Sequence, residues 1–224
     1  MSLPVFTHGD AGEQARALAA LVAADLRAAI AARGRASFAA PGGSTPTAFL
    51  AALAAETVDW ERVIVMPGDE RWTAPTDARS NEGMIRAALP QPAFLSFWNA
   101  DEAPEAAALR LSAALAGHLP LDVAVIGMGE DMHCASLFPG ADALPAAMAA
   151  GAAPVAAIRA PGAPEPRLTL TLPALAGAGR LYLLIRGQAK RAALAEAEAE
   201  PNPLKAPVGA VLRAARSAEI HWAP

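Results

Sequence analysis

Residues 122–129 read Asp122-Val123-Ala124-Val125-Ile126-Gly127-Met128-Gly129, and this stretch decides the fold class. It holds a short apolar run without polar alternation, and a glycine follows the run at once. A run of this kind is typical of a β-strand that is buried on both faces, as in a parallel sheet covered by helices. We therefore predict a strand over residues 122–126 that leads into a glycine-rich loop.

Similar short runs recur along the chain and alternate with longer alanine-rich segments, which favour helices. Strands separated by helical segments indicate crossover connections and a mostly parallel sheet with helices on both faces. A length of 224 residues suits one domain, so we expect a single-domain, Rossmann-like α/β fold over residues 1–224. The expected strands cover residues 36–40, 62–66, 122–126, 155–158, 168–172, 181–185 and 217–222, and the expected helices cover residues 12–33, 46–55, 81–89, 102–119 and 189–198.

The composition argues against several classes of protein. A hydrophobic fraction of 54% with 18% charged residues is that of a globular chain, not of a disordered segment or a coiled coil. The net charge of −4 argues against nucleic acid as a partner, because binding to its backbone needs a basic face. We see no apolar run of the roughly 20 residues that cross a bilayer, no secretory signal, and only one cysteine. We expect a cytoplasmic protein without a disulfide or a membrane partner.

Four motifs directly follow or precede predicted strands, where α/β folds bind their ligands. The first is Pro41-Gly42-Gly43-Ser44-Thr45-Pro46, which joins a strand to a helix. Gly42 and Gly43 let the backbone approach a ligand closely, while Thr45 is placed to cap the helix and Pro46 suits its first position. A helix N-terminus with the hydroxyls of Ser44 and Thr45 beside it would bind an anion. A well-capped turn without a ligand is the alternative.

The second motif is the charged run Asp69-Glu70-Arg71, and Ser80-Asn81 opens the helix after it. Three neighbouring charged side chains cannot all point to solvent if the loop folds over a cleft. One carboxylate would then orient a base or a substrate hydroxyl, and Arg71 would hold negative charge. The alternative is a solvated loop followed by an ordinary helix cap.

The third motif is the loop that contains His133, after the strand over residues 122–126. A histidine titrates near neutral pH, so it can take a proton from water and return it to a leaving alkoxide. Glycines at the strand exit let the imidazole approach a ligand, and Glu130 and Asp131 lie just before it. The alternative is a histidine with a purely structural role.

Three other functions of this loop are disfavoured by its sequence. A dinucleotide-binding G-x-G-x-x-G motif would need glycine where Met132 stands. A metal site would need a second His or Cys at usable spacing besides Cys134. Cys134 as a nucleophile would need activation by His133, but neighbouring side chains of an extended segment diverge. We expect neither a metal nor a cofactor.

The fourth motif is a pair of basic residues. Arg167 precedes the strand predicted over residues 168–172, and Lys190 follows the strand over residues 181–185. Each would bring a cation to the sheet edge where the loop of residues 41–46 lies. Two cations beside a helix N-terminus suit a phosphate dianion. Either residue alone would be ordinary on an exposed loop or helix.

Together these segments resemble the 6-phosphogluconolactonase family, within the larger group that includes glucosamine-6-phosphate deaminase/isomerase. The similarity covers residues 41–46, 69–71 with 80–81, 127–139, 167–173 and 187–190, in the expected order. It implies a hydrolase that converts 6-phospho-D-glucono-1,5-lactone to 6-phosphogluconate in the oxidative pentose phosphate pathway. Its partner would be a small-molecule sugar-phosphate lactone, and we expect a monomer or a weak homo-oligomer.

The resemblance also implies residue roles. His133 is the expected catalytic base, and Asp69 and Arg71 are expected polar residues of the active site. The expected phosphate-binding residues are Gly42, Gly43, Ser44, Thr45, Arg167 and Lys190. The deaminases carry Asp-Glu-Tyr at the position of Asp69-Glu70-Arg71 and an Asn-Glu-Pro run soon after the histidine. This chain has Ser136-Leu137-Phe138-Pro139 there, which favours a lactonase.

One motif departs from the family pattern. The family usually reads Asp-Gly-His-Thr where this chain has Asp131-Met132-His133-Cys134. If that glycine has a positive φ, Met132 is strained there by about 1 kcal/mol or more, and Cys134 lacks the threonine hydroxyl. Because the base is retained, we expect reduced or altered activity and not its loss. The alternatives are a deaminase or isomerase of the same group and a non-catalytic sugar-phosphate-binding protein.

Overall fold

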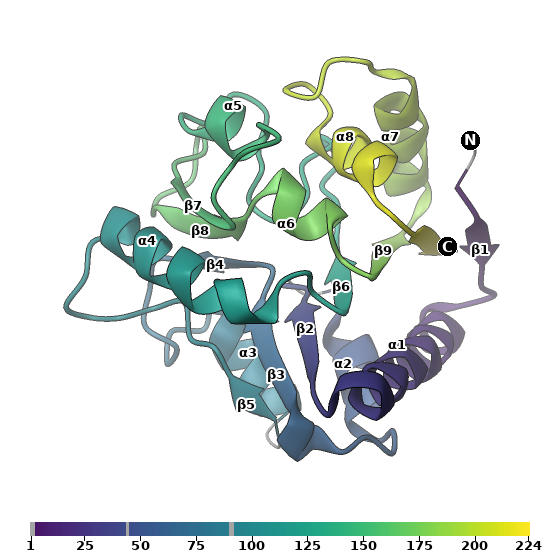
Figure 1. Ribbon diagram of the computed structural model, residues 1–224. Helices are drawn as coiled ribbons and strands as arrows, with labels where there is room; N and C mark the ends of the chain where they lie inside the picture. The colour runs from purple at the N-terminus through teal and green to yellow at the C-terminus, as the bar shows by residue number, and fades with distance from the viewer. Residues whose placement is uncertain (1–2, 44, 90–91) are drawn as a thin grey trace.

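A seven-stranded parallel sheet forms the centre of the protein (Figure 1). The computed structural model describes residues 3–43, 45–89 and 92–224. The strand order is β1-β10-β9-β6-β2-β3-β5, which confirms the predicted α/β fold with a mostly parallel sheet. The strands are β1 (Val5–Thr7), β2 (Ala36–Ala40), β3 (Val63–Pro67), β5 (Ala93–Phe94), β6 (Val123–Ile126), β9 (Arg180–Arg186) and β10 (Ala218–Ala223).

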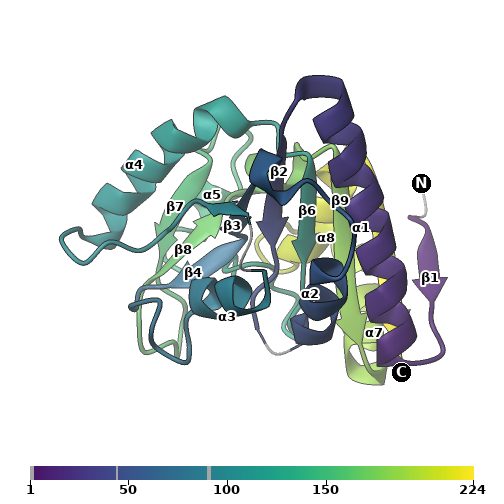
Figure 2. The same cartoon turned by 90° about the horizontal axis from the view of Figure 1, so that it is seen from below.

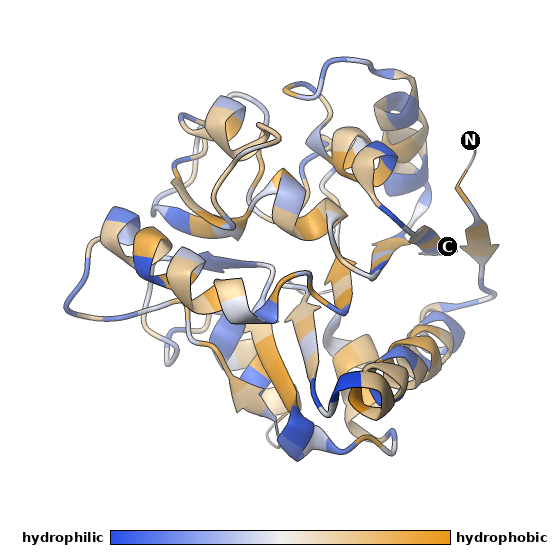
Figure 3. Ribbon diagram, in the orientation of Figure 1, coloured by the Kyte–Doolittle hydropathy of each residue, from blue (hydrophilic) through white to orange (hydrophobic). Residues whose placement is uncertain are grey.

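The central strands contribute side chains to two separate cores, because successive residues of a strand point to opposite faces. In β6, Val123 and Val125 pack into one core, whereas Ala124 and Ile126 pack into the other. The sheet is thus buried on both faces, which explains the continuous apolar runs in the sequence. The central strands are apolar over most of their length (Figure 3).

Helices cover both faces of the sheet (Figures 1 and 2). Short 3-10 turns at Trp60–Arg62 and Ala116–His118 precede β3 and follow α4. No helix of the described residues is long and apolar enough to cross a membrane. One face carries α1 (Ala11–Arg33), α2 (Thr47–Ala54) and α3 (Asn81–Ala88), and the other carries α4 (Pro104–Leu115), α5 (Leu144–Ala147), α6 (Leu172–Ala176), α7 (Gln188–Ala199) and α8 (Pro207–Ala214).

Two predicted strands lie outside the main sheet. β7 (Val155–Ile158) and β8 (Arg167–Leu170) join β4 (Asp69–Arg71) in a second, antiparallel sheet with the order β4-β8-β7. The strand predicted over residues 168–172 ends at Leu170, because α6 begins at Leu172 and has a proline in its first turn. Proline has no backbone N–H to donate but is tolerated at the start of a helix.

The strand order reverses between β2 and β6, and this reversal positions the candidate site. From β2 the chain continues outward through β3 and β5, whereas from β6 it continues in the opposite direction through β9 and β10. The loops that leave these two neighbouring strands therefore diverge. Such a divergence opens a crevice at the carboxyl ends of the strands, where ligands bind in this class of fold.

Candidate active site

A cleft of about 240 Å³ opens at the carboxyl ends of β2 and β6. It collects segments that lie far apart in the sequence, from the loop after β2 to the first turn of α7. Ser44, one of the predicted site residues, lies outside the described residues. The other predicted site residues all line the cleft: Gly42, Gly43, Thr45, Asp69, Arg71, His133, Arg167 and Lys190. Their chemical roles stay predictions.

The loop of residues 41–46 depends on its two glycines. Gly43 has a φ of 89°, which glycine adopts without steric cost. A Cβ on Gly42 would lie 2.2 Å from the side-chain nitrogen of Asn81, so glycine is required for this close approach. Asn81 Oδ1 in turn accepts a hydrogen bond from the Gly43 N–H at 3.3 Å. Thr45 lines the cleft and is not the helix cap that we predicted, because Pro46 is the N-cap residue of α2.

Glu70 of β4 connects this strand to the N-terminus of α3 through hydrogen bonds. Its carboxylate accepts hydrogen bonds from the backbone N–H groups of Asn81 at 2.9 Å and Glu82 at 2.6 Å, and from the Ser80 hydroxyl at 3.0 Å. Burial raises the pKa of Glu70, and these donors oppose the shift. Glu70 thereby satisfies the free N–H groups at the start of α3. Because successive side chains of a strand point to opposite faces, Asp69 and Arg71 lie on the face of β4 that borders the cleft.

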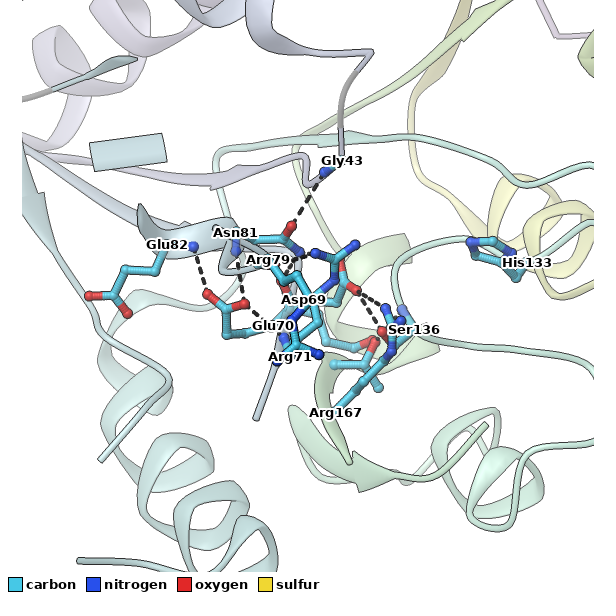
Figure 4. Close-up of polar contacts among 12 residues, drawn as sticks. Gly43, Asp69, Glu70, Arg71, Arg79, Asn81, Glu82, His133, Ser136 and Arg167 are labelled. Carbon is cyan, nitrogen blue, oxygen red and sulfur yellow. Dashed lines mark hydrogen bonds and ion pairs between the residues drawn. The ribbon is translucent and has the colours of Figure 1, made fainter. Parts of the chain in front are cut away.

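Asp69 is held by contacts from three different segments (Figure 4). Its Oδ2 accepts a hydrogen bond from the fully buried Ser136 hydroxyl at 2.5 Å. Its Oδ1 accepts one from Asn81 Nδ2 at 3.3 Å, and Arg167 Nη1 lies 3.9 Å from Oδ2. The Ser136 N–H is itself bonded to Thr169 Oγ1 at 3.1 Å. The carboxylate is therefore fixed in position between α3, β8 and the loop after β6.

Two arginines face each other across the second sheet. Arg71 of β4 is the register partner of Arg167 of β8, and both line the cleft. Like charges that stand opposite in an antiparallel pair destabilise a sheet. The Nε of each arginine is buried and has no hydrogen-bond partner among the described residues. Burial lowers the pKa of Arg167, the charge of Arg71 adds to the shift, and Asp69 opposes it. This arrangement suits an anionic ligand.

Lys190 brings a third cation from another side. It lies in the first turn of α7, after Gly187 turns the chain out of β9 with a φ of 82°. The Lys190 side chain is half-buried and lines the cleft together with Thr45. The cleft therefore receives positive charge from β4, β8 and α7, as a binding site for a phosphate group requires.

His133 lies on the loop after β6, with a quarter of its side chain exposed (26%). Its Nδ1 is 2.5 Å from Oδ1 of Asp131. We assign the proton of the neutral ring to Nδ1, since a carboxylate is an acceptor, and Nε2 is then the nitrogen that can take a proton. A Cβ on Gly129 would lie 2.3 Å from the imidazole, so glycine is needed beneath the ring. The imidazole also packs on the ring of Phe138.

The backbone around His133 is held in an uncommon conformation. Met132 has a φ of 66° and Ala135 a φ of 48°. The positive φ that we considered for Met132 is therefore present, and it costs about 1–2 kcal/mol in a residue other than glycine. The Met132 N–H donates to the Gly129 carbonyl at 3.1 Å, and its own carbonyl accepts from the Val208 N–H of α8 at 3.1 Å. These two bonds hold the strained turn in place.

Cys134 is fully buried, and burial raises the pKa of its thiol. The thiolate is the reactive form of cysteine, so a buried thiol of this kind is inert at neutral pH. The geometry therefore disfavours Cys134 as a nucleophile. Within the described ranges, no cluster of three or more His, Cys, Asp or Glu side chains is arranged to hold a metal ion.

Sequence reasoning assigned no role in the site to Asn81, Ser136 or Phe138. Asn81 appeared as a residue that opens a helix and as part of the family resemblance, without a role of its own. Ser136 is a single hydroxyl inside the apolar run 134–138, and a buried polar residue in such a run needs a partner. Phe138 entered only as part of the run 136–139 that favours a lactonase, and no role followed for it, because its two contacts depend on the folding of separate segments.

Comparison with known proteins identifies close relatives. Residues 9–222 match the family model described as glucosamine-6-phosphate isomerases/6-phosphogluconolactonase. A curated protein of Rhizobium meliloti named 6-phosphogluconolactonase is 44% identical over 218 residues, which are 94% of this chain and 94% of that protein. One of Pseudomonas aeruginosa with the same name is 42% identical over 228 residues, covering 96% and 93%. The crystal structure of a 6-phosphogluconolactonase from Shewanella baltica has a TM-score of 0.95 at 29% identity, covering 100% of this chain and 98% of that one.

Proposed function

The chain belongs to the glucosamine-6-phosphate isomerase/6-phosphogluconolactonase family, and from this premise we propose that it hydrolyses 6-phospho-D-glucono-1,5-lactone to 6-phosphogluconate. This is a carboxylic ester hydrolysis in the oxidative pentose phosphate pathway. The names of the relatives from Rhizobium meliloti and Pseudomonas aeruginosa support it. The observation that carries it is the facing pair Arg71 and Arg167, in a cleft that also contains His133.

The cations of the cleft provide the binding energy. Arg167 and Lys190 bind the phosphate, together with the loop residues Gly42, Gly43, Ser44 and Thr45. Two guanidiniums placed opposite each other repel, and a negatively charged substrate in the cleft reduces this repulsion. Anchoring the phosphate fixes the lactone ring, so binding energy is converted into correct placement of the carbonyl carbon.

His133 acts as the general base. Nε2 takes a proton from water as the water oxygen bonds to the carbonyl carbon, and Arg71 or backbone N–H groups stabilise the oxyanion. The bond from this carbon to the ring oxygen then breaks, and the imidazolium returns its proton to that oxygen. Asp131 stabilises the imidazolium through Nδ1. One water is consumed, and the product acid releases its proton to solvent.

The departures from the family motif change the loop without removing the base. Met132 takes the strained φ of 66°, and its bonds to Gly129 and Val208 compensate part of the cost. Cys134 is fully buried and does not line the cleft. We therefore keep the proposal of an active enzyme, with activity that is reduced or altered relative to chains with glycine and threonine there.

We further propose a domain organisation, a cellular location and an oligomeric state for the protein. Because the cleft takes residues from the loop after β2 through to α7, residues 1–224 act as one lactonase domain. The proposed reaction uses water and the side chains and backbone N–H groups of this chain, so it needs no metal or cofactor. A phosphorylated lactone is a charged metabolite, which supports a cytoplasmic enzyme. We retain the expectation of a monomer or weak homo-oligomer.

The purified chain should accelerate proton release from 6-phosphogluconolactone above the spontaneous rate. His133→Ala should lower kcat by roughly 10² to 10⁴ while the affinity for 6-phosphogluconate stays similar. Lys190→Ala should chiefly raise KM, because it removes binding that is uniform along the reaction. His118→Ala is the matched control, since His118 lies in the 3-10 turn after α4 and does not line the cleft.

Three results would contradict the proposal. Ammonia release from glucosamine 6-phosphate without lactone hydrolysis would identify a deaminase. Saturable binding of 6-phosphogluconate without acceleration of hydrolysis would identify a sugar-phosphate-binding protein. An unchanged kcat in His133→Ala would remove the imidazole from the reaction.

A further inference from the structure

The ring of Phe138 contacts both the expected base, His133, and an expected phosphate-binding residue, Arg167. The ring centroid of Phe138 lies 4.1 Å from that of His133, with 32° between the ring planes. The guanidinium carbon of Arg167 lies 5.2 Å from the centroid of the same ring. The first distance is that of close ring packing, and the second lies within the range of cation–π attraction. Phe138 is thus a physical link between two side chains that come from different elements.

The ring itself is firmly placed. The Phe138 N–H donates to the Ser136 carbonyl at 3.1 Å, and the Phe138 carbonyl accepts from the Ala141 N–H at 3.1 Å. Ser136 is in turn bonded to Asp69 at 2.5 Å and to Thr169 at 3.1 Å. The backbone that carries the ring is therefore attached to β4 and β8, so the ring forms a rigid surface for the two side chains to pack on.

We propose that Phe138 is a positioning residue that sets the separation between the imidazole of His133 and the guanidinium of Arg167. This inference rests on the proposed function. In a lactone with an anchored phosphate, the distance from phosphate to carbonyl carbon is set by the sugar ring. The separation between His133 and Arg167 must match that distance, so that the base lies beside the carbonyl carbon when the phosphate is bound. The Phe138 ring packs on both side chains and thereby keeps them at this separation.

A second phenylalanine in the same chain provides the control. The guanidinium carbon of Arg86 lies 4.3 Å from the ring centroid of Phe94, and Phe94 is partly buried like Phe138. Phe94 belongs to β5 at the edge of the main sheet, and neither residue of this pair lines the cleft. Phe94→Leu therefore removes an aromatic ring from an arginine pair without disturbing the site.

The test compares Phe138→Leu, Phe138→Met and Phe138→Tyr with wild type and Phe94→Leu. Loss of both ring contacts should lower kcat/KM for 6-phosphogluconolactone roughly tenfold in the Leu and Met variants, with lower kcat and higher KM. Phe138→Tyr keeps the ring and should stay within about twofold of wild type. With the unphosphorylated glucono-1,5-lactone, the loss should be smaller, because Arg167 then has no phosphate to hold.

The outcomes separate this inference from the proposed function. Wild type without lactonase activity would refute the proposed function. Active wild type with unchanged kcat/KM in Phe138→Leu or Phe138→Met would overturn the inference alone. A Phe138→Tyr variant no better than Phe138→Leu, or an equal loss in Phe94→Leu, would also overturn it. If Phe138→Leu does not fold, Phe138→Met carries the comparison, since methionine adapts to fill irregular space in a core.

Discussion

Replacing Ser136 by alanine removes one buried oxygen atom and takes from Asp69 its shortest hydrogen bond. The Ser136 hydroxyl is fully buried and donates to Asp69 Oδ2 at 2.5 Å. The remaining partners are longer, at 3.3 Å for Asn81 and 3.9 Å for Arg167, so they cannot replace it. A hydrogen bond to a charged group contributes about 1.5–3 kcal/mol. We expect Ser136→Ala to lower the free energy of unfolding by about 2 kcal/mol.

The same substitution should also lower kcat for lactone hydrolysis several-fold, because a carboxylate without its shortest bond is less well fixed beside the cleft. Urea unfolding followed by tryptophan fluorescence measures the stability, and proton release measures kcat. Ser112→Ala is the matched control, since the Ser112 hydroxyl bonds the neutral backbone of Val155. It should cost about 1 kcal/mol and leave kcat unchanged. A Ser136→Ala variant no less stable than Ser112→Ala would refute the reasoning.

Two further predictions concern the imidazoles. Gly129→Ala should displace the His133 ring, since the new Cβ would lie 2.3 Å from it, and kcat should fall at least tenfold by proton-release assay; Gly151→Ala, which meets nothing within 4 Å, should match wild type. Burial lowers the pKa of His221 to about 4, with His8 adding to the shift. The unfolded chain then binds more protons between pH 6.5 and 4, so the free energy of unfolding should fall by up to about 3 kcal/mol as pH decreases through this window. Urea unfolding at several pH values in this window should show that the free energy of unfolding depends less on pH in His221→Phe than in wild type. An equal pH dependence of the two proteins would contradict the lowered pKa.

Local sequence patterns predicted most strands of the main sheet and several of the helices that cover it. The strands β2 and β7 have the predicted bounds, because a short apolar run between a polar turn and a proline or glycine has few other ways to be buried. The ends of other elements moved by one to four residues, as for the helix predicted over residues 102–119, where α4 ends at Leu115 and a 3-10 turn follows. Ends depend on capping contacts that a local pattern does not specify.

The second sheet was beyond the reach of local patterns. Residues 155–158 and 168–172 show strand character, but nothing in them states that their partner is the short charged segment Asp69–Arg71. Pairing and register depend on contacts between segments that are about 100 residues apart. The opposition of Arg71 and Arg167, which carries the proposed function, is a consequence of that register.

The amino-acid sequence alone thus determined most strands of the main sheet and the helices α1 to α4 and α7, that the sheet is buried on both faces, and that charged motifs follow the strands. It did not predict the strands β1, β4 and β5 or the helices α5, α6 and α8. Periodicity and turn residues are local properties, and each segment carries them by itself. Only the tertiary structure decided that Glu70 supports α3 while Asp69 faces the cleft, and that Phe138 contacts both His133 and Arg167. These relations arise from packing between distant segments, so they exist only once the whole chain has folded.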